Sequence, residues 1–204
     1  MLATLIWLSS TSGAAAADQV VIKAYNTYGL PEHAARTVSR TVHRLFTDAG
    51  IETKWRHCRV VGRRTSLEQD PCSNVLAPNE LIVRIVGGAA VGSGDPTMAL
   101  GDAFIDPVTR QGALATVYVD RVAAVAATLG VDVGTMVGRA VTHELAHLLL
   151  GTHTHSAAGL MRATWRSMGL LRTEETDWLF TPEQRTVLRV AVADRSAKTT
   201  RGRW

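Results

Sequence analysis

The chain has 204 residues, of which 46% are hydrophobic and 20% are charged. These proportions are typical of a globular protein, and the length is enough for one domain with a buried core. The formal net charge is +4, and it is accounted for by the segment from Thr181 onward, which has six basic and two acidic residues. This basic tail lacks interleaved aromatic residues, so it does not predict nucleic-acid binding. We expect a monomer.

Residues Met1 to Ala17 contain no charged side chain. An apolar run from Leu2 to Leu8 leads to a stretch of small residues whose end resembles a signal-peptidase site. The run is too short to span a bilayer, although the usual positive charge before it is missing. We predict a signal peptide over 1–17, secretion or release into the periplasm, and no stable membrane insertion after cleavage.

The rest of the chain alternates between strand-like and helix-like segments. Apolar and turn-residue patterns predict strands over 19–26, 51–56, 80–86 and 113–120, and helices over 31–49, 123–129 and 132–150, with a last helix from Thr181. Residues 87–107 are too irregular to assign. We expect an α+β fold with a mostly four-stranded twisted sheet, one domain over 18–195 and a flexible basic tail over 196–204.

Two cysteines, Cys58 and Cys72, flank a polar and basic loop. An even count in an exported chain predicts one disulfide between them. Neither cysteine has a C-x-x-C partner, so the pair does not predict a zinc-thiolate site. Reduced, buried thiols are the alternative if the chain stays in the cytoplasm.

His143-Glu144-x-x-His147 is an H-E-x-x-H pattern. On a helix, residues four apart lie on one face, so both imidazoles can reach one metal ion. Glu144 lies beside the first histidine, where its carboxylate can take a proton from a water that the metal activates. The helix is apolar nearly all round, and two buried histidines and a glutamate would be costly there without a metal. A buried helix with incidental histidines is the less favoured interpretation.

Two histidines after the helix could complete the site. His155 lies four residues beyond Gly151, whereas His153 lies only two beyond it. Because the chain must turn back toward the metal after this glycine, we favour His155 as the third ligand and keep His153 as the alternative. A downstream glutamate, Glu174 or Glu175, would give a thermolysin-like site instead. Asp95, Asp102 and Asp106 follow the third strand, but loop carboxylates are usually solvated and do not predict a second ion.

The helical H-E-x-x-H, a glycine, a further histidine and a later methionine resemble the metzincin zinc endopeptidases. Residues 143–162 are also similar to a pattern in a group of small bacterial proteins, H-E-x-x-H-L-L-L-G-x-x-x-H-S-x-x-G-I-M-R. The resemblance implies a metzincin-like domain, one catalytic Zn²⁺, Glu144 as general base and Met161 as the methionine beneath the metal. Two features depart from metzincins: Leu150 stands where their glycine is expected, and no tyrosine follows Met161.

Together these features predict a zinc-dependent endopeptidase in which His143, His147 and a third histidine hold the ion. Its substrate would be an extended peptide or protein segment that pairs with a sheet edge, for which we expect the strand over 113–120. A non-catalytic zinc-binding module of the same fold is the alternative from another class. The glutamate between the histidines argues against it, because a structural zinc site does not need that carboxylate.

Overall fold

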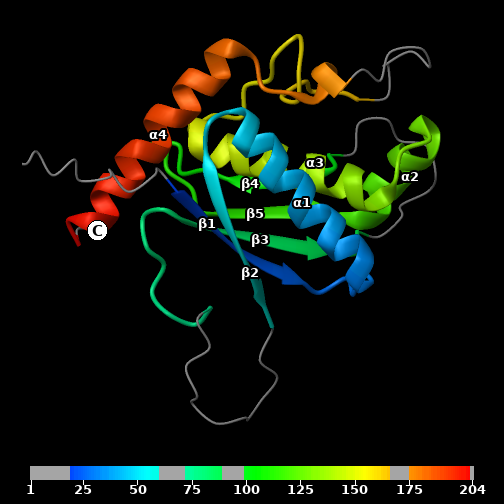
Figure 1. Ribbon diagram of the computed structural model, residues 1–204, viewed down its shortest axis with the longest axis horizontal. Coiled ribbons are helices and arrows are strands. Elements are labelled where there is room, and N and C mark those ends of the chain that lie inside the picture. Colours follow the sequence, from blue (N-terminus) through cyan, green and yellow to red (C-terminus); the bar gives the residue numbers. More distant parts are fainter. Residues whose placement is uncertain (1–18, 60–71, 89–98, 166–174, 203–204) are drawn as a thin grey trace, which may run out of the picture.

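The computed structural model describes residues 19–59, 72–88, 99–165 and 175–202 (Figure 1). The predicted signal peptide, Asp95 and Glu174 lie outside these residues. In chain order the elements are β1 (Gln19–Asn26), α1 (Glu32–Asp48), β2 (Glu52–Cys58), β3 (Glu80–Val86), β4 (Gly101–Phe104), β5 (Leu114–Tyr118), α2 (Val119–Leu129), α3 (Val133–Leu150), the 3₁₀ helix η1 (Glu175–Trp178) and α4 (Pro182–Thr200). In the described part, no helix has both the length and the apolar character needed to cross a bilayer.

The sheet has five strands in the order β2-β1-β3-β5-β4. The first four are parallel, and β4 pairs antiparallel with β5, from Gly101 opposite Val117 to Phe104 opposite Leu114. The prediction that residues 113–120 form the sheet edge is therefore wrong, because β5 has a neighbour on each side. The predicted four strands are present, and β4 arises within the segment that the sequence left unassigned.

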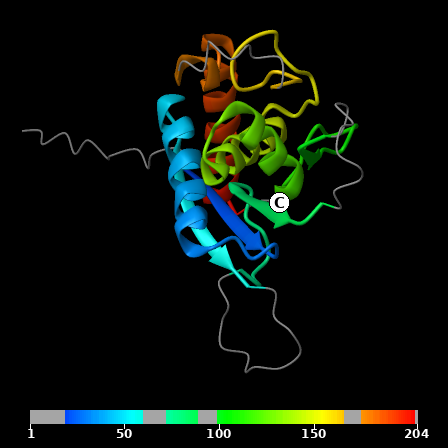
Figure 2. The same cartoon turned by 90° about the vertical axis from the view of Figure 1, so that its right-hand side faces the viewer.

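The sheet is covered on one face by α1 and α3. Figure 2 shows α1 on one side of α3 and β4 on the other. The two helices approach closely at Gly138, where an added Cβ would lie 2.6 Å from the Cβ of Thr41. Side chains of α1, α3 and the inner face of the sheet form one continuous apolar core. Within this core α3 packs against β4 and β5.

The other face of the sheet buries a charged cluster. Lys23 lies on β1, and its Nζ is 2.8 Å from Oε2 of Glu80 on β3. Arg56 on β2 places its Nη1 3.0 Å from Oε1 of the same carboxylate. Lys23 is only 1% exposed, so the carboxylate satisfies a cation that has left water.

The last helix crosses the strand starts. The guanidinium of Arg195 donates to the carbonyls of Pro78, Gly112 and Leu148 at 3.1, 2.8 and 3.2 Å. The helix begins where the sequence predicts, and Thr181 caps it in a capping box with Gln184. The helix continues through Thr200, so residues 196–200 of the expected flexible tail are helical.

Cys58, at the end of β2, forms a disulfide with Cys72, and their Cα atoms are 5.8 Å apart. The predicted bond is confirmed. It joins the end of β2 to the segment that precedes β3. The bond thus braces the periphery of the sheet and takes no part in the histidine cluster on α3.

Candidate metal centre

The helix that carries the H-E-x-x-H pattern begins and ends as its sequence predicts. The carboxylate of Asp132 accepts a hydrogen bond from the Thr135 amide at 2.8 Å and caps the N-terminus. At the C-terminus Gly151 adopts φ +62°, and its amide donates to the His147 carbonyl. An added Cβ at Gly151 would lie 2.5 Å from the Arg110 carbonyl oxygen, so this reversal has no room for a side chain.

The two histidines of α3 are almost completely buried and face each other. His143 is 6% exposed and His147 is 3% exposed. The Nδ1 of His143 lies 2.9 Å from the carbonyl oxygen of Leu160, and the Nδ1 of His147 lies 2.7 Å from that of Thr152. Their Nε2 atoms are 3.0 Å apart.

These contacts determine which ring nitrogens carry protons. A carbonyl oxygen only accepts hydrogen bonds, so each Nδ1 must be the protonated nitrogen. Burial lowers the pKa of His143 to about 3 and that of His147 to about 4, so both rings are neutral near neutral pH. Each Nε2 therefore presents an unprotonated lone pair to the other. A cation bound between them would satisfy both lone pairs.

His155 completes a cluster with this pair. One ring nitrogen from each of His143, His147 and His155 lies within 4.8 Å of the others. The ring of His155 is centred 5.3 Å from that of His143 and 4.9 Å from that of His147. The alternative, His153, is centred 6.0 Å from His147 and lies outside the cluster. The geometry is thus the one expected if His155 is the third ligand.

The turn beyond α3 is held by backbone contacts. The amide of Ser156 donates to the Met161 carbonyl at 2.8 Å, and Met161 is fully buried. Arg162 points away from the histidines, and its guanidinium donates to the carbonyls of Gly159 and Asp177 at 3.1 and 3.2 Å. The turn is therefore fastened to η1 on one side and, through Leu160, to His143 on the other.

An aromatic stack behind His143 was not predicted from the sequence. The ring of Trp165 meets His143 edge-on at 5.5 Å, and Trp178 meets Trp165 edge-on at 5.3 Å. The guanidinium of Arg139, one helical turn before His143, lies 3.9 Å from the Trp178 ring centre. No local pattern marks these contacts, because each joins segments that are distant in sequence. The stack limits the positions that the His143 ring can adopt.

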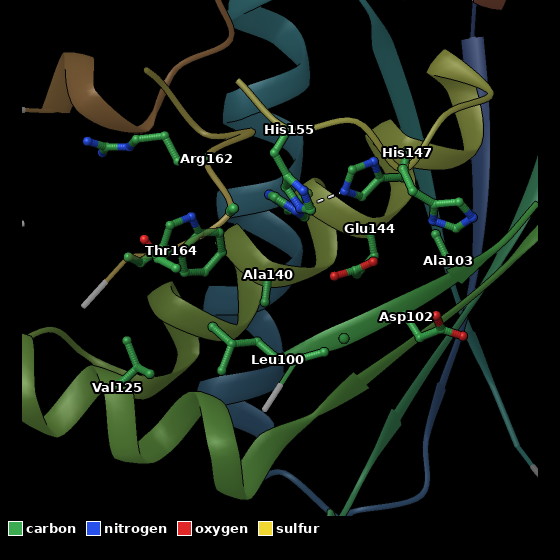
Figure 3. A pocket seen from close by; sticks show the side chains of 16 residues that line it. Leu100, Asp102, Ala103, Val125, Ala140, Glu144, His147, His155, Arg162 and Thr164 are labelled. Carbon is green, nitrogen blue, oxygen red and sulfur yellow. Dashed lines mark hydrogen bonds between the residues drawn. The ribbon is translucent and has the colours of Figure 1, made fainter. Parts of the chain in front are cut away.

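The carboxylate of Glu144 faces a cavity of about 550 Å³ beside the histidines (Figure 3). Glu144 is 8% exposed, and burial together with the charge of Asp102 raises its pKa to about 8. The cavity is lined by Ala99, Leu100, Gly101, Asp102, Ala103, Val125, Ala140, His143, Glu144, His147, His153, His155, Arg162, Ala163, Thr164 and Trp165. It therefore lies between α3, the turn after it, and β4.

The structure does not gather the loop carboxylates into a second ion site among the described residues. Asp106 accepts hydrogen bonds from the amides of Val108 and Thr109 at 3.0 and 2.7 Å, so it caps its own turn. Asp102 lies on β4 and lines the cavity. Glu175 begins η1, and the metal cluster of the described residues contains histidines only.

The chain matches no protein-family model and no curated protein. Several solved structures share its fold, including these two. A zinc-dependent peptidase from Methanocorpusculum labreanum (strain Z) has a TM-score of 0.51 and 13% identity, over 82% of this chain and 99% of that one. An archaemetzincin from Methanopyrus kandleri has a TM-score of 0.51 and 17% identity, over 88% and 99%. At these identities the similarity establishes a common mixed α/β fold.

Proposed function

We propose that the chain is a zinc-dependent endopeptidase of the metzincin type. The observation that carries the proposal is the convergence of three imidazoles next to the buried carboxylate of Glu144, at a cavity bounded by the sheet edge. The structural neighbours support it, because both are described as zinc peptidases or archaemetzincins. The disulfide is typical of an oxidising compartment and fits the export that the first residues predict.

The residues present fit a zinc ion. Neutral imidazole nitrogens are preferred zinc ligands, and three of them leave a fourth position open, as catalytic sites require. Tetrahedral zinc with Zn–N distances of about 2.0–2.1 Å separates two nitrogen ligands by roughly 3.4 Å. The Nε2 atoms of His143 and His147 are 3.0 Å apart, so a small adjustment brings them to that separation. His155 would supply the third nitrogen and Met161 the buried floor of the turn.

Zinc, when bound, polarises a carbonyl and makes water more acidic. The protein residue that moves the proton is Glu144, whose carboxylate accepts it from the attacking water and returns it to the leaving amine. In the metal-free protein burial raises the pKa of this carboxyl to about 8, and the positive charge of a bound zinc would lower it, so that the group is ionised and can accept the proton. His143 and His147 keep their Nδ1 protons in hydrogen bonds to Leu160 and Thr152 and so keep their orientation.

The substrate edge must be reassigned to β4. An extended peptide adds most simply to a terminal strand, and β4 is the terminal strand on the cavity side. Main-chain hydrogen bonds to this strand would hold the peptide independently of its side chains. Peptide bonds in an extended segment are therefore the proposed substrate.

The test is the Glu144→Gln variant. We expect it to retain zinc while its peptide hydrolysis falls by about 10²–10⁴-fold, the contribution of a general acid–base group. Zinc content is measured on purified protein, and cleavage is followed with an unbiased peptide library. Glu52→Gln, at an exposed position on β2, is the matched control and should cleave normally. Wild-type rates in Glu144→Gln would refute the general-base role, and zinc binding without any wild-type cleavage would favour the non-catalytic module.

A further inference from the structure

The edge strand β4 comes unusually close to the proposed general base. A Cβ added to Gly101 would lie 2.6 Å from Cγ of Glu144 and 2.7 Å from its Oε1. The same Cβ would lie 2.7 Å from the backbone oxygen of Thr116 on β5. Favourable contacts between non-bonded heavy atoms are about 3.5–4.0 Å, so a side chain at position 101 would collide with the carboxylate.

The glycine is required by space and not by its backbone conformation. The φ angle of Gly101 is not among the positive values found in the described residues. Glycine weakens a strand interior, because it loses more freedom on folding and offers no side chain to pack. Gly101 therefore lowers the stability of β4, a strand of only four residues. The close approach of Glu144 explains why a glycine is found there in spite of this cost.

The contact lies on the side of β4 that faces α3. Gly101 and Ala103 are buried toward α3, whereas Asp102 and Phe104 alternate to the exposed face. Figure 3 shows Glu144 extending from α3 into the space beside this strand. The carboxylate thus occupies the volume that a side chain at position 101 would fill.

We propose that Gly101 is a positioning residue that admits the Glu144 carboxylate against the edge strand. The inference rests on the proposed function. Since β4 is also the strand that would carry the peptide, the missing side chain brings the proton acceptor next to the bound backbone. A methyl group at position 101 would push Glu144 away from β4 while leaving the three histidines in place.

A nearby glycine provides a matched control. An added Cβ at Gly112 would lie 2.3 Å from the Phe104 carbonyl oxygen and 2.7 Å from Cδ2 of Leu148. Gly112→Ala therefore disturbs the same strand and the same helix without touching Glu144. Any effect that comes only from loosening the edge strand should appear in both variants.

The first test measures stability in metal-free protein. Gly101→Ala and Gly112→Ala should both lower Tm. Gly101→Ala should lower Tm by about 3 °C more in the wild-type background than in the Glu144→Ala background. Glu144→Ala removes the side-chain atoms that the new methyl group would meet, but it leaves the contact with the Thr116 oxygen. Gly112→Ala should cost the same in both backgrounds. Equal losses for Gly101→Ala in the two backgrounds would overturn the proposal.

The comparison stays decisive if Gly101→Ala does not fold. Recovery of a cooperative transition in the double variant with Glu144→Ala would then support the proposal. If both proteins remain unfolded, the collision with Thr116 accounts for the loss, and the positioning role is wrong.

The second test uses the zinc-loaded protein. Gly101→Ala should keep its zinc content and KM but lose at least about tenfold in kcat, whereas Gly112→Ala should keep kcat. In the Glu144→Gln background, Gly101→Ala should cause no further loss. A wild type that binds zinc and cleaves nothing refutes the proposed function, while the stability test still decides the contact. If the wild type is active and Gly101→Ala has the same kcat, the positioning role is refuted while the proposed function stands.

Discussion

Replacing His155 with alanine should remove most of the stabilisation that zinc gives to the folded protein, whereas replacing His153 should leave it. The structure gives the reason for this ranking. His155 contributes a ring nitrogen to the cluster within 4.8 Å, and His153 does not. Both side chains are exposed, so neither substitution should open the core.

The size of the effect follows from mass action. A ligand at 100 times its Kd stabilises the folded state by about 2.7 kcal/mol. For a domain of this length about 1 kcal/mol shifts Tm by 2–4 °C, so zinc should raise the wild-type Tm by about 5–11 °C. Loss of a residue that only supports a metal ligand weakens metal binding by up to about 100-fold. Loss of the ligand itself should therefore weaken zinc binding by at least about 100-fold. At the same zinc concentration the gain for His155→Ala is then about 0.4 kcal/mol, or less than about 2 °C.

The assay is thermal unfolding of chelator-treated protein at a series of buffered zinc concentrations. His153→Ala should follow the wild-type curve, and His155→Ala should need about 100-fold more zinc for the same shift. Equal metal-free Tm values for the three proteins are the control for folding. The opposite ranking would make His153 the third ligand, and no wild-type shift at any concentration would refute the metal centre.

Two further predictions concern buried carboxylates. In the metal-free protein, burial and the charge of Asp102 raise the pKa of Glu144 to about 8. The folded protein therefore has its full stability below the pKa that this group has in the unfolded chain, and it loses stability as the pH rises from there toward 8. Glu144→Gln should therefore flatten the fall in Tm between about pH 5 and pH 9, and equal slopes would contradict the assignment. Glu80→Gln should cost about 3–5 kcal/mol in urea unfolding at neutral pH, because Lys23 would stay buried without its carboxylate. Burial acts to raise the pKa of Glu80, but Lys23, the Ala77 amide and Arg56 together lower it below its ordinary value. The stability lost in Glu80→Gln should therefore shrink as the pH falls through this lowered pKa. A loss that stays constant with pH would be inconsistent with the ion pair.

The parts of the fold that local signals encode were predictable. The cap at Asp132, the left-handed Gly151 and the apolar pattern between them define α3 within the sequence itself. The position of His143 and His147 on one face then follows from helical geometry. The disulfide followed from the cysteine count, because only one pairing exists.

The edge strand was not predictable in the same way. The segment from Gly101 to Phe104 has one glycine, one aspartate and no β-branched residue, so its own strand preference is low. It becomes a strand because β5 offers hydrogen-bonding partners in register. Only the tertiary structure shows this pairing, and only the structure shows that Gly101 faces Glu144.

The proposed metal centre depends on backbone groups as much as on its histidines. The i, i+4 spacing brings two imidazoles to one face, but it does not determine which nitrogen of each ring points at the other. The carbonyls of Leu160 and Thr152 make that choice, because each accepts a hydrogen bond from the protonated Nδ1 and so leaves Nε2 as the unprotonated nitrogen. Both carbonyls lie in the chain after Gly151, which also returns His155 to the cluster. The reversal at this glycine therefore orients all three imidazoles, and the H-E-x-x-H pattern alone specifies only their approximate place.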